Sequence, residues 1–165
     1  MGMDVYGKNA TAEVGGYFRN NVWWWHPLAE FLTTTYPDLT AGCIHWQSND
    51  GDGLDAAASV ALADALDRDL ANGRVTAYAD QYAAEQNALP DSECDLCHGR
   101  GLRTDAIGRE YGYDKPRDPD TGKGGCNGCA GTGRREHFGK SYPFDVENVR
   151  EFAAFLRHCG GFEIC

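Results

Sequence analysis

Cys94-Asp95-Leu96-Cys97-His98-Gly99-Arg100-Gly101 is repeated, as a pattern, by Cys126-Asn127-Gly128-Cys129-Ala130-Gly131-Thr132-Gly133. Both stretches read Cys-x-x-Cys-x-Gly-x-Gly, and each is called a knuckle below. A spacing of two residues lets both sulfurs of a pair reach one ion at about 2.3 Å. The glycines permit positive φ, so the chain can fold back and aim amide N–H groups at the thiolates. The repeat therefore predicts one structural Zn2+ ion held by four cysteines, Cys94, Cys97, Cys126 and Cys129.

Two other kinds of site also use paired cysteines. A thioredoxin-like redox pair needs a βαβ context, which the sequence around the knuckles lacks. A catalytic zinc keeps three protein ligands and a water; His98 adjoins Cys97 and could replace it, but four thiolates already fill the shell. The remaining cysteines, Cys43, Cys159 and Cys165, stand apart and are expected to be reduced. This cysteine usage suits a reducing compartment.

The sequence around the knuckles differs in character from the rest of the chain. Residues 91–136 are rich in glycine, charge and turn residues and poor in aliphatic ones. Such a stretch cannot bury a core of its own and needs a metal to fold. We therefore predict a helical core domain formed by residues 1–90 and 137–165, with a zinc-knuckle module inserted at 91–136. The expected fold class is mainly α (α+β), with about four helices and a small β element.

Apolar periodicity and end signals place the elements of the core domain. The best-defined helix begins after Asp145, a candidate N-cap, and ends at Gly160-Gly161. Two further helices, joined by Asn72-Gly73, are expected to be antiparallel neighbours because their link is short. These two are expected at about 54–71 and 75–89, and another helix at 27–35. Short strands are expected at 42–47 and 162–164, and the first 25 residues are expected to form mainly loops with a short strand.

The charge of the chain narrows the choice of partners. It carries 25 acids and 15 bases in 165 residues, a formal charge of −10, which disfavours nucleic acid as a partner. The knuckle stretch is the most nearly balanced, so an anion is expected to contact its arginines, Arg100, Arg103, Arg134 and Arg135. No apolar run approaches the roughly 20 residues that cross a bilayer. With no leader at its start, the chain is expected to be cytoplasmic.

Tryptophans form a second group of interest. Trp23, Trp24 and Trp25 are consecutive, and Trp46 lies apart. In an extended segment Trp23 and Trp25 would face one way and Trp24 the other. We favour a core role for them. The alternative is an aromatic wall for a flat ligand, with polar contacts from Arg19 and the two asparagines that follow it.

An acidic turn, Ser48-Asn49-Asp50-Gly51-Asp52-Gly53, precedes Leu54. It does not fit an EF-hand, because the sixth position counted from Asp50 is Asp55 rather than glycine. A turn leading into a helix, whose first turn favours acids, explains it. His45 precedes this turn and is the most plausible ligand contact among the histidines. The candidate ligand-binding set is therefore Arg19, Trp23, Trp25, His45, Trp46, Asp50 and Asp52.

Residues 94–133 resemble the cysteine-rich segment of DnaJ-type chaperones, which uses the same Cys-x-x-Cys-x-Gly-x-Gly unit. Those proteins have four units and two zinc ions, so two units here imply one zinc. The whole chain also looks like a family of uncharacterised small proteins from phages and bacteria. The phrases that carry this resemblance are Met3-Asp4-Val5-Tyr6-Gly7-Lys8, Tyr17–Trp25, Ser48–Leu54 and Cys159–Ile164. It implies a phage-encoded protein acting in a host cytoplasm.

The sequence contains no nucleophile elbow, phosphate-binding loop, dinucleotide fingerprint or metalloprotease motif, so we expect a protein that is not an enzyme. The first hypothesis is a zinc-stabilised binding protein that docks a protein partner through its acidic helical face or its zinc module. The alternative is a protein that binds or sequesters a small ligand, such as a signalling nucleotide, through the tryptophan-rich segment and the 48–55 loop. A hydrolase using Asp50, Asp52 and His45 is the third and weakest hypothesis, and the oligomeric state is left open.

Overall fold

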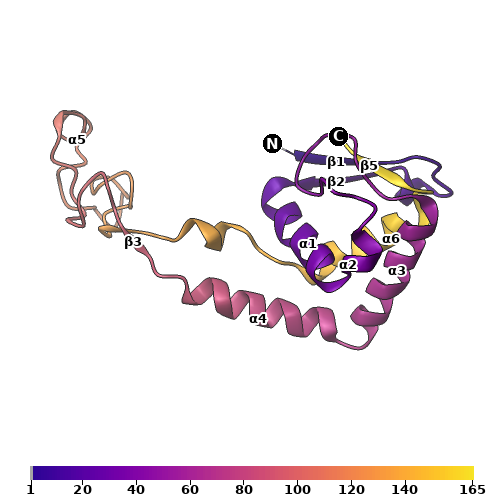
Figure 1. Cartoon of the computed structure of the whole chain (residues 1–165). Helices are drawn as coiled ribbons and strands as arrows, with labels where there is room; N and C mark the ends of the chain where they lie inside the picture. The colour runs from indigo at the N-terminus through magenta and orange to yellow at the C-terminus, as the bar shows by residue number, and fades with distance from the viewer. Residues whose placement is uncertain (1) are drawn as a thin grey trace. The chain divides into compact units, whose positions relative to one another are not determined.

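The computed structural model describes residues 2–165, which form an α+β protein of helices and small sheets. The chain divides into two compact units (Figure 1). Unit 1 comprises the residues up to Asn87 together with Ser141–Cys165, and unit 2 comprises Ala88–Lys140. Within residues 2–165, no helix combines the length and the apolar character needed to span a bilayer.

A three-stranded antiparallel sheet forms one layer of unit 1. Strand β1 (Gly2–Gly7) lies in the middle, between β2 (Tyr17–Asn21) and β5 (Phe162–Ile164). Val5 lies opposite both Phe18 and Ile164, and all three side chains are buried. The strand expected at 162–164 is present as β5, but the first 25 residues contain two strands, with the short 3-10 helix η1 (Glu13–Gly15) between them. The expectation of mainly loops was wrong because strand pairing supplies order that the local sequence does not signal.

The acidic turn completes the open edge of this sheet. The amide of Gly51 donates to the carbonyl of Ile164, and the amide of Ile164 donates to the carbonyl of Asp52, both at 2.8 Å. A Cβ on Gly53 would lie 2.0 Å from the carbonyl oxygen of Phe162, so only glycine allows this approach. The strand expected at 42–47 is wrong: those residues form turns, and the Asp52 carboxylate accepts two of their amide N–H groups.

Helix α1 (Val22–Thr35) begins five residues earlier than expected. Asn21 is its N-cap, and the side-chain oxygen of Asn21 accepts from the amides of Trp23 at 3.0 Å and Trp24 at 3.2 Å. Pro27 lies inside the helix rather than in its first turn, where its missing N–H removes one helical hydrogen bond. The cap and the burial of the following turns outweigh that loss. The short helix α2 (Pro37–Thr40) follows directly.

Three more helices complete unit 1. Helix α3 (Ala56–Ala71) is capped by Asp55, and α6 (Val146–His158) is capped by Asp145 as expected. Helix α4 (Arg74–Ala88) is not packed along α3; it turns away at Gly73, whose φ is 82° (Figure 1). Helix α3 packs against α6 instead, because the apolar face of α6 supplies the larger surface to bury.

The core of unit 1 lies between the sheet and helices α1, α3 and α6. In Figure 1, α1 and α6 lie against one face of the sheet. Phe152 of α6 occupies the centre, edge-on to Trp25 with ring centroids 5.7 Å apart. Phe18 and Phe162 contact the same ring from the sheet, at 5.1 and 6.1 Å. These aromatic contacts join the helices to the strands.

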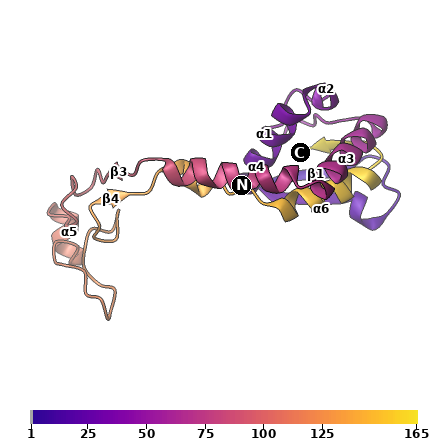
Figure 2. The same cartoon turned by 90° about the horizontal axis from the view of Figure 1, so that it is seen from below.

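Unit 2 contains little regular structure. Strands β3 (Ser92–Glu93) and β4 (Arg134–Arg135) pair antiparallel and are neighbours in Figure 2. The short helix α5 (Ala106–Tyr111) lies between the knuckles in sequence, and the 3-10 helix η2 (Phe138–Ser141) follows β4. Among the described residues of this unit, the buried hydrophobic cluster consists of four cysteines alone. Aliphatic packing therefore contributes little to the stability of unit 2.

Candidate metal centre

The four knuckle cysteines converge on one point. Their sulfur atoms all lie within 4.8 Å of one another. The Cys94 and Cys126 sulfurs are 3.8 Å apart, and those of Cys97 and Cys129 are 3.7 Å apart. A tetrahedron with metal–sulfur bonds of about 2.3 Å has edges of about 3.8 Å. The cluster therefore fits a tetrahedral metal ion such as zinc.

The two knuckles are related to each other by reciprocal hydrogen bonds. The amide of Cys94 donates to the carbonyl of Gly133 at 2.9 Å, and the amide of Cys126 donates to the carbonyl of Gly101 at 2.7 Å. The amides of the same two glycines donate to sulfur, Gly101 to Cys97 at 3.3 Å and Gly133 to Cys129 at 3.2 Å. Each knuckle thus closes against the other and presents an N–H group to its own second cysteine.

Backbone conformation explains why the glycines recur. Gly101 and Gly133 have φ of 72° and 79°, a region that favours glycine. A Cβ on Gly101 would lie 2.4 Å from the carbonyl oxygen of Gly131, and a Cβ on Gly133 would lie 2.2 Å from that of Gly99. Two separate reasons therefore favour glycine at the last position of each knuckle: its positive φ and the close approach of the other knuckle.

The pKa values of the clustered thiols indicate how their charge must be offset. Burial raises the pKa of Cys126 to about 11, although the Gly128 amide opposes the shift. Burial also acts to raise the pKa of Cys129, but N–H groups from Gly133 and Gly131 and the neighbouring Cys97 thiol lower it to about 7. Four thiolates at this spacing repel one another, so a cation is needed to offset their charge.

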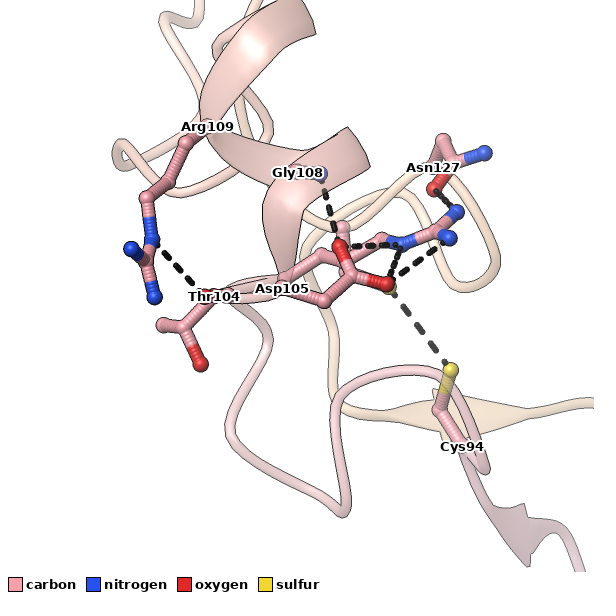
Figure 3. A network of polar contacts seen from close by, with 8 residues as sticks. Cys94, Thr104, Asp105, Gly108, Arg109 and Asn127 are labelled. Atoms are coloured by element: carbon pink, nitrogen blue, oxygen red, sulfur yellow. Dashed lines mark hydrogen bonds and ion pairs between the residues drawn. The ribbon is translucent and has the colours of Figure 1, made fainter.

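A polar network supports the second knuckle from outside (Figure 3). Arg103, only 9% exposed, pairs with Asp105 through two nitrogens at 3.0 and 2.9 Å. A third nitrogen of Arg103 donates to the Asn127 side chain at 3.1 Å. Asp105 also caps α5 by accepting the Gly108 amide at 2.7 Å, and its bond to Arg103 holds the pKa of the Asp105 carboxyl below its usual range. Arg103 thus joins α5 to the metal-binding segment.

The other three arginines proposed for an anion also donate to the protein. Arg100 donates to the carbonyl of Cys97 at 3.1 Å, and Arg135 donates to the carbonyl of Gly128 at 3.2 Å. Arg134 donates to the carbonyl of Asp91. These three arginines therefore donate to backbone carbonyls in or near the knuckles, whereas Arg103 donates to side chains.

The candidate ligand-binding residues fall into separate places. Trp25 and Trp46 are buried together, with the Trp25 indole nitrogen 2.6 Å from the Trp46 carbonyl oxygen. Trp23 is 38% exposed and contacts the ring of Tyr142. Trp23 and Trp25 lie on helix α1, so the alternation described for an extended segment does not apply to them. The core role favoured for the tryptophans applies to Trp25 and Trp46.

The remaining candidates line different hollows or turns. Arg19 lines a hollow of about 490 Å³ with three carboxylates, those of Asp145, Glu147 and Glu151. His45 and Trp46 line another, of about 380 Å³. Asp50 accepts from the Ser48 hydroxyl at 2.5 Å, and Asp52 holds the preceding turn. Arg19 thus lines a different hollow from the one that His45 and Trp46 line.

Comparison with protein-family models, with curated proteins and with solved structures gives no match for this chain. The resemblances to DnaJ-type segments and to small phage proteins therefore rest on the motifs alone. One group of residues escaped the sequence analysis: Lys115, Arg117 and Lys123, which line a hollow between the knuckles. A concentration of cations among glycines between two metal-binding pairs was the available signal.

Proposed function

We propose that this protein is a non-enzymatic binding protein in which one structural zinc ion holds unit 2 and an acidic unit 1 docks a basic protein partner. The observation that carries the proposal is the closed four-cysteine cluster, which supplies the only buried hydrophobic cluster among the described residues of unit 2. A metal at this point stabilises the fold of the unit, as in small metallo-domains that fold only when loaded.

The donor set favours zinc in a structural role. Four thiolates in a tetrahedron suit zinc, whereas a catalytic zinc keeps one position for water. Amide N–H groups of Gly101 and Gly133 already occupy positions beside two of the sulfurs. His98 is exposed and is not among the clustered ligand atoms. The site therefore has no open position at which a substrate would bind.

The distribution of charge supports a basic partner for unit 1. This unit contains 16 acids and six bases, whereas unit 2 contains nine of each. The full formal charge of −10 thus belongs to unit 1. A surface of this kind attracts basic protein surfaces and speeds their association. Glu30 of α1 and Asp80 of α4 are exposed acids without an ion pair within residues 2–165.

Charge reversal in one unit at a time tests this function. The double variant Glu30→Lys/Asp80→Lys changes unit 1, and Glu110→Lys/Glu136→Lys makes the same change in exposed residues of unit 2. Partners cross-linked to the zinc-loaded chain in a cell extract are compared by mass spectrometry at low and high salt. We expect a partner that is lost with the unit 1 variant and at high salt, and kept with the unit 2 variant. A partner kept by both variants, or insensitive to salt, contradicts the proposal.

A further inference from the structure

A hollow of unit 2 lies in the segment between the knuckles. Its volume is about 810 Å³, and its wall includes Tyr111, Tyr113, Lys115, Arg117 and Lys123. Small-molecule sites have volumes of about 300–1,000 Å³. The size of the hollow is therefore that of a site for one small molecule.

The cationic side chains of the hollow are distinguished by making no side-chain hydrogen bond or ion pair with the described residues of the protein. Unit 2 has nine cationic side chains, and six of them donate hydrogen bonds to protein acceptors, namely Arg100, Arg103, Arg109, Arg134, Arg135 and Lys140. Within residues 2–165, the other three make no side-chain hydrogen bond or ion pair: Lys115, Arg117 and Lys123. All three line this hollow. Three unpaired cations around one concavity favour an anion.

A tight turn brings two of these cations together. The amide of Asp118 donates to the carbonyl of Lys123 at 2.7 Å, and the amide of Gly122 donates to the carbonyl of Asp118 at 2.9 Å. The guanidinium of Arg117 lies beside Gly122, 3.4 Å from where a Cβ would be. Asp118 is the one acid in the wall, and its carboxylate accepts the amides of Asp120 and Thr121 at 2.8 and 3.1 Å. Three cations against one engaged carboxylate leave the wall positive.

An aromatic surface lies at the same hollow. The rings of Tyr111 and Tyr113 are stacked, with centroids 6.1 Å apart and planes inclined by 16°. Tyr111 is 64% exposed and belongs to the wall of the hollow, so its side chain is accessible to a ligand. Planar bases stack favourably on accessible aromatic side chains. The wall therefore combines cations that attract phosphate with a tyrosine side chain on which a base can stack.

We propose that this hollow binds a nucleotide, with its phosphates held by Lys115, Arg117 and Lys123 and its base against Tyr111. A free nucleotide is favoured over a nucleic-acid strand for two reasons. The hollow has the volume of one small molecule, and the −10 charge of unit 1 repels a long polyanion. This site lies in unit 2 and is independent of the protein docking proposed for unit 1.

The metal centre supports the wall of the hollow. Gly124 and Gly125 belong to the wall and directly precede the ligand Cys126. The amide of Gly125 donates to the carbonyl of Lys115 at 2.6 Å, and a Cβ on Gly124 would lie 2.4 Å from the carbonyl oxygen of Pro116. The part of the wall that carries Lys115 is thus tied by this hydrogen bond to the segment that precedes Cys126. Nucleotide binding therefore requires the metal-loaded chain.

Calorimetric titration of the zinc-loaded full chain tests the site, with ATP, pyrophosphate and adenosine as separate probes. The triple variant Lys115→Gln/Arg117→Gln/Lys123→Gln is expected to weaken ATP binding at least about 100-fold, because it removes several charge-assisted contacts. The matched control Lys8→Gln/Arg19→Gln/Arg68→Gln makes the same charge change in exposed residues of unit 1 and is expected to bind ATP like the wild type. Tyr111→Ala is expected to weaken ATP binding and leave pyrophosphate binding unchanged.

The zinc content of each variant, measured by native mass spectrometry, shows that unit 2 remains folded. The proposal is overturned if the triple variant binds ATP like the control, or if the wild type binds neither ATP nor pyrophosphate at millimolar concentration. A single-stranded oligonucleotide that binds more tightly than ATP overturns the choice of a free nucleotide. Loss of ATP binding in the triple variant alone supports the site whatever the outcome for protein docking.

Discussion

The carboxylate of Asp52 accepts the amide N–H of His45 at 2.8 Å. The same oxygen accepts the amide of Ile44 at 2.6 Å, and the other oxygen accepts the amide of Gly53 at 2.8 Å. These three backbone donors hold the pKa of Asp52 below its usual range. The acidic turn that suggested a ligand site is therefore explained by its own backbone, since one carboxylate fixes the turn before it and the edge of the sheet.

Asp52→Asn is expected to lower the melting temperature near pH 7, because an amide offers one acceptor oxygen in place of two. The folded-state pKa of Asp52 lies below its unfolded value, so its stabilisation is present above about pH 4 and is lost as the pH falls through the folded-state pKa. Thermal melts from pH 7 to pH 2.5 should show the two proteins converging at acid pH. Asp80→Asn, at an exposed position, serves as the control; a constant difference across the range would contradict the assignment.

Metal removal should unfold unit 2 and spare unit 1. The buried cluster of unit 2 among the described residues is the four cysteines, whereas unit 1 has its own aromatic core. After treatment with a zinc chelator, hydrogen exchange should become fast at residues 88–140 and stay slow in α3 and α6. Native mass spectrometry of the untreated protein should find one zinc per chain. Protection of residues 88–140 that survives the chelator would rule out metal-dependent folding.

Alanine at Gly101 or Gly133 should weaken zinc binding to a similar extent, since each Cβ would meet a carbonyl oxygen of the other knuckle at 2.4 or 2.2 Å. Gly112→Ala is the matched control. Gly112 also has a positive φ, 75°, but nothing lies within 4 Å of an added Cβ. This variant should therefore lose only the conformational free energy of a non-glycine residue at positive φ, about 1–2 kcal/mol. Competition with a chromophoric chelator measures the affinities. Equal losses for all three variants would mean that backbone angle alone matters.

Truncation of Phe152 to alanine should destabilise unit 1 by about 3–5 kcal/mol, because this fully buried ring contacts aromatic side chains of α1 and of both outer strands. Val60→Ala, at a side chain 40% exposed on α3, should change the free energy of unfolding by no more than about 0.5 kcal/mol. Urea denaturation of the zinc-loaded protein gives both values. A loss below about 1 kcal/mol for Phe152→Ala would show that the core tolerates the cavity.

Features that depend on residues adjacent in the chain could be predicted from the sequence. The cap at Asp145, the helix end at Gly160 and the cysteine spacing each depend on a few adjacent positions, and the structure has the first two as expected and clusters the four cysteines. Strands β1 and β2 could not be predicted because their order comes from pairing with each other and with β5. The start of α1 was missed because Asn21 was treated as a polar contact rather than a cap.

The candidate sites show the same division between local and distant information. Spacing alone selects four cysteines that share one point, because the ligands of a knuckle are close in the chain. Whether an arginine is engaged depends on acceptors brought by folding, as with Arg103 and its partners Asp105 and Asn127. The sequence shows the cations of the hollow as a concentration between the knuckles, but only the folded structure shows that they lack such acceptors.

The hydrogen bond from the Cys126 amide to the Gly101 carbonyl, 2.7 Å long, joins the two ends of residues 102–125. Contacts between the knuckles thereby hold the ends of this loop together and offset the entropic cost of closing it. That cost grows only slowly with loop length. The segment behaves as an exchangeable cassette: its length and side chains can change while its two attachment points stay fixed. Homologous chains that keep both knuckles and the contact of Arg103 with Asn127 are therefore free to diverge most at 104–125, and loops transplanted there with this contact kept should leave metal affinity intact.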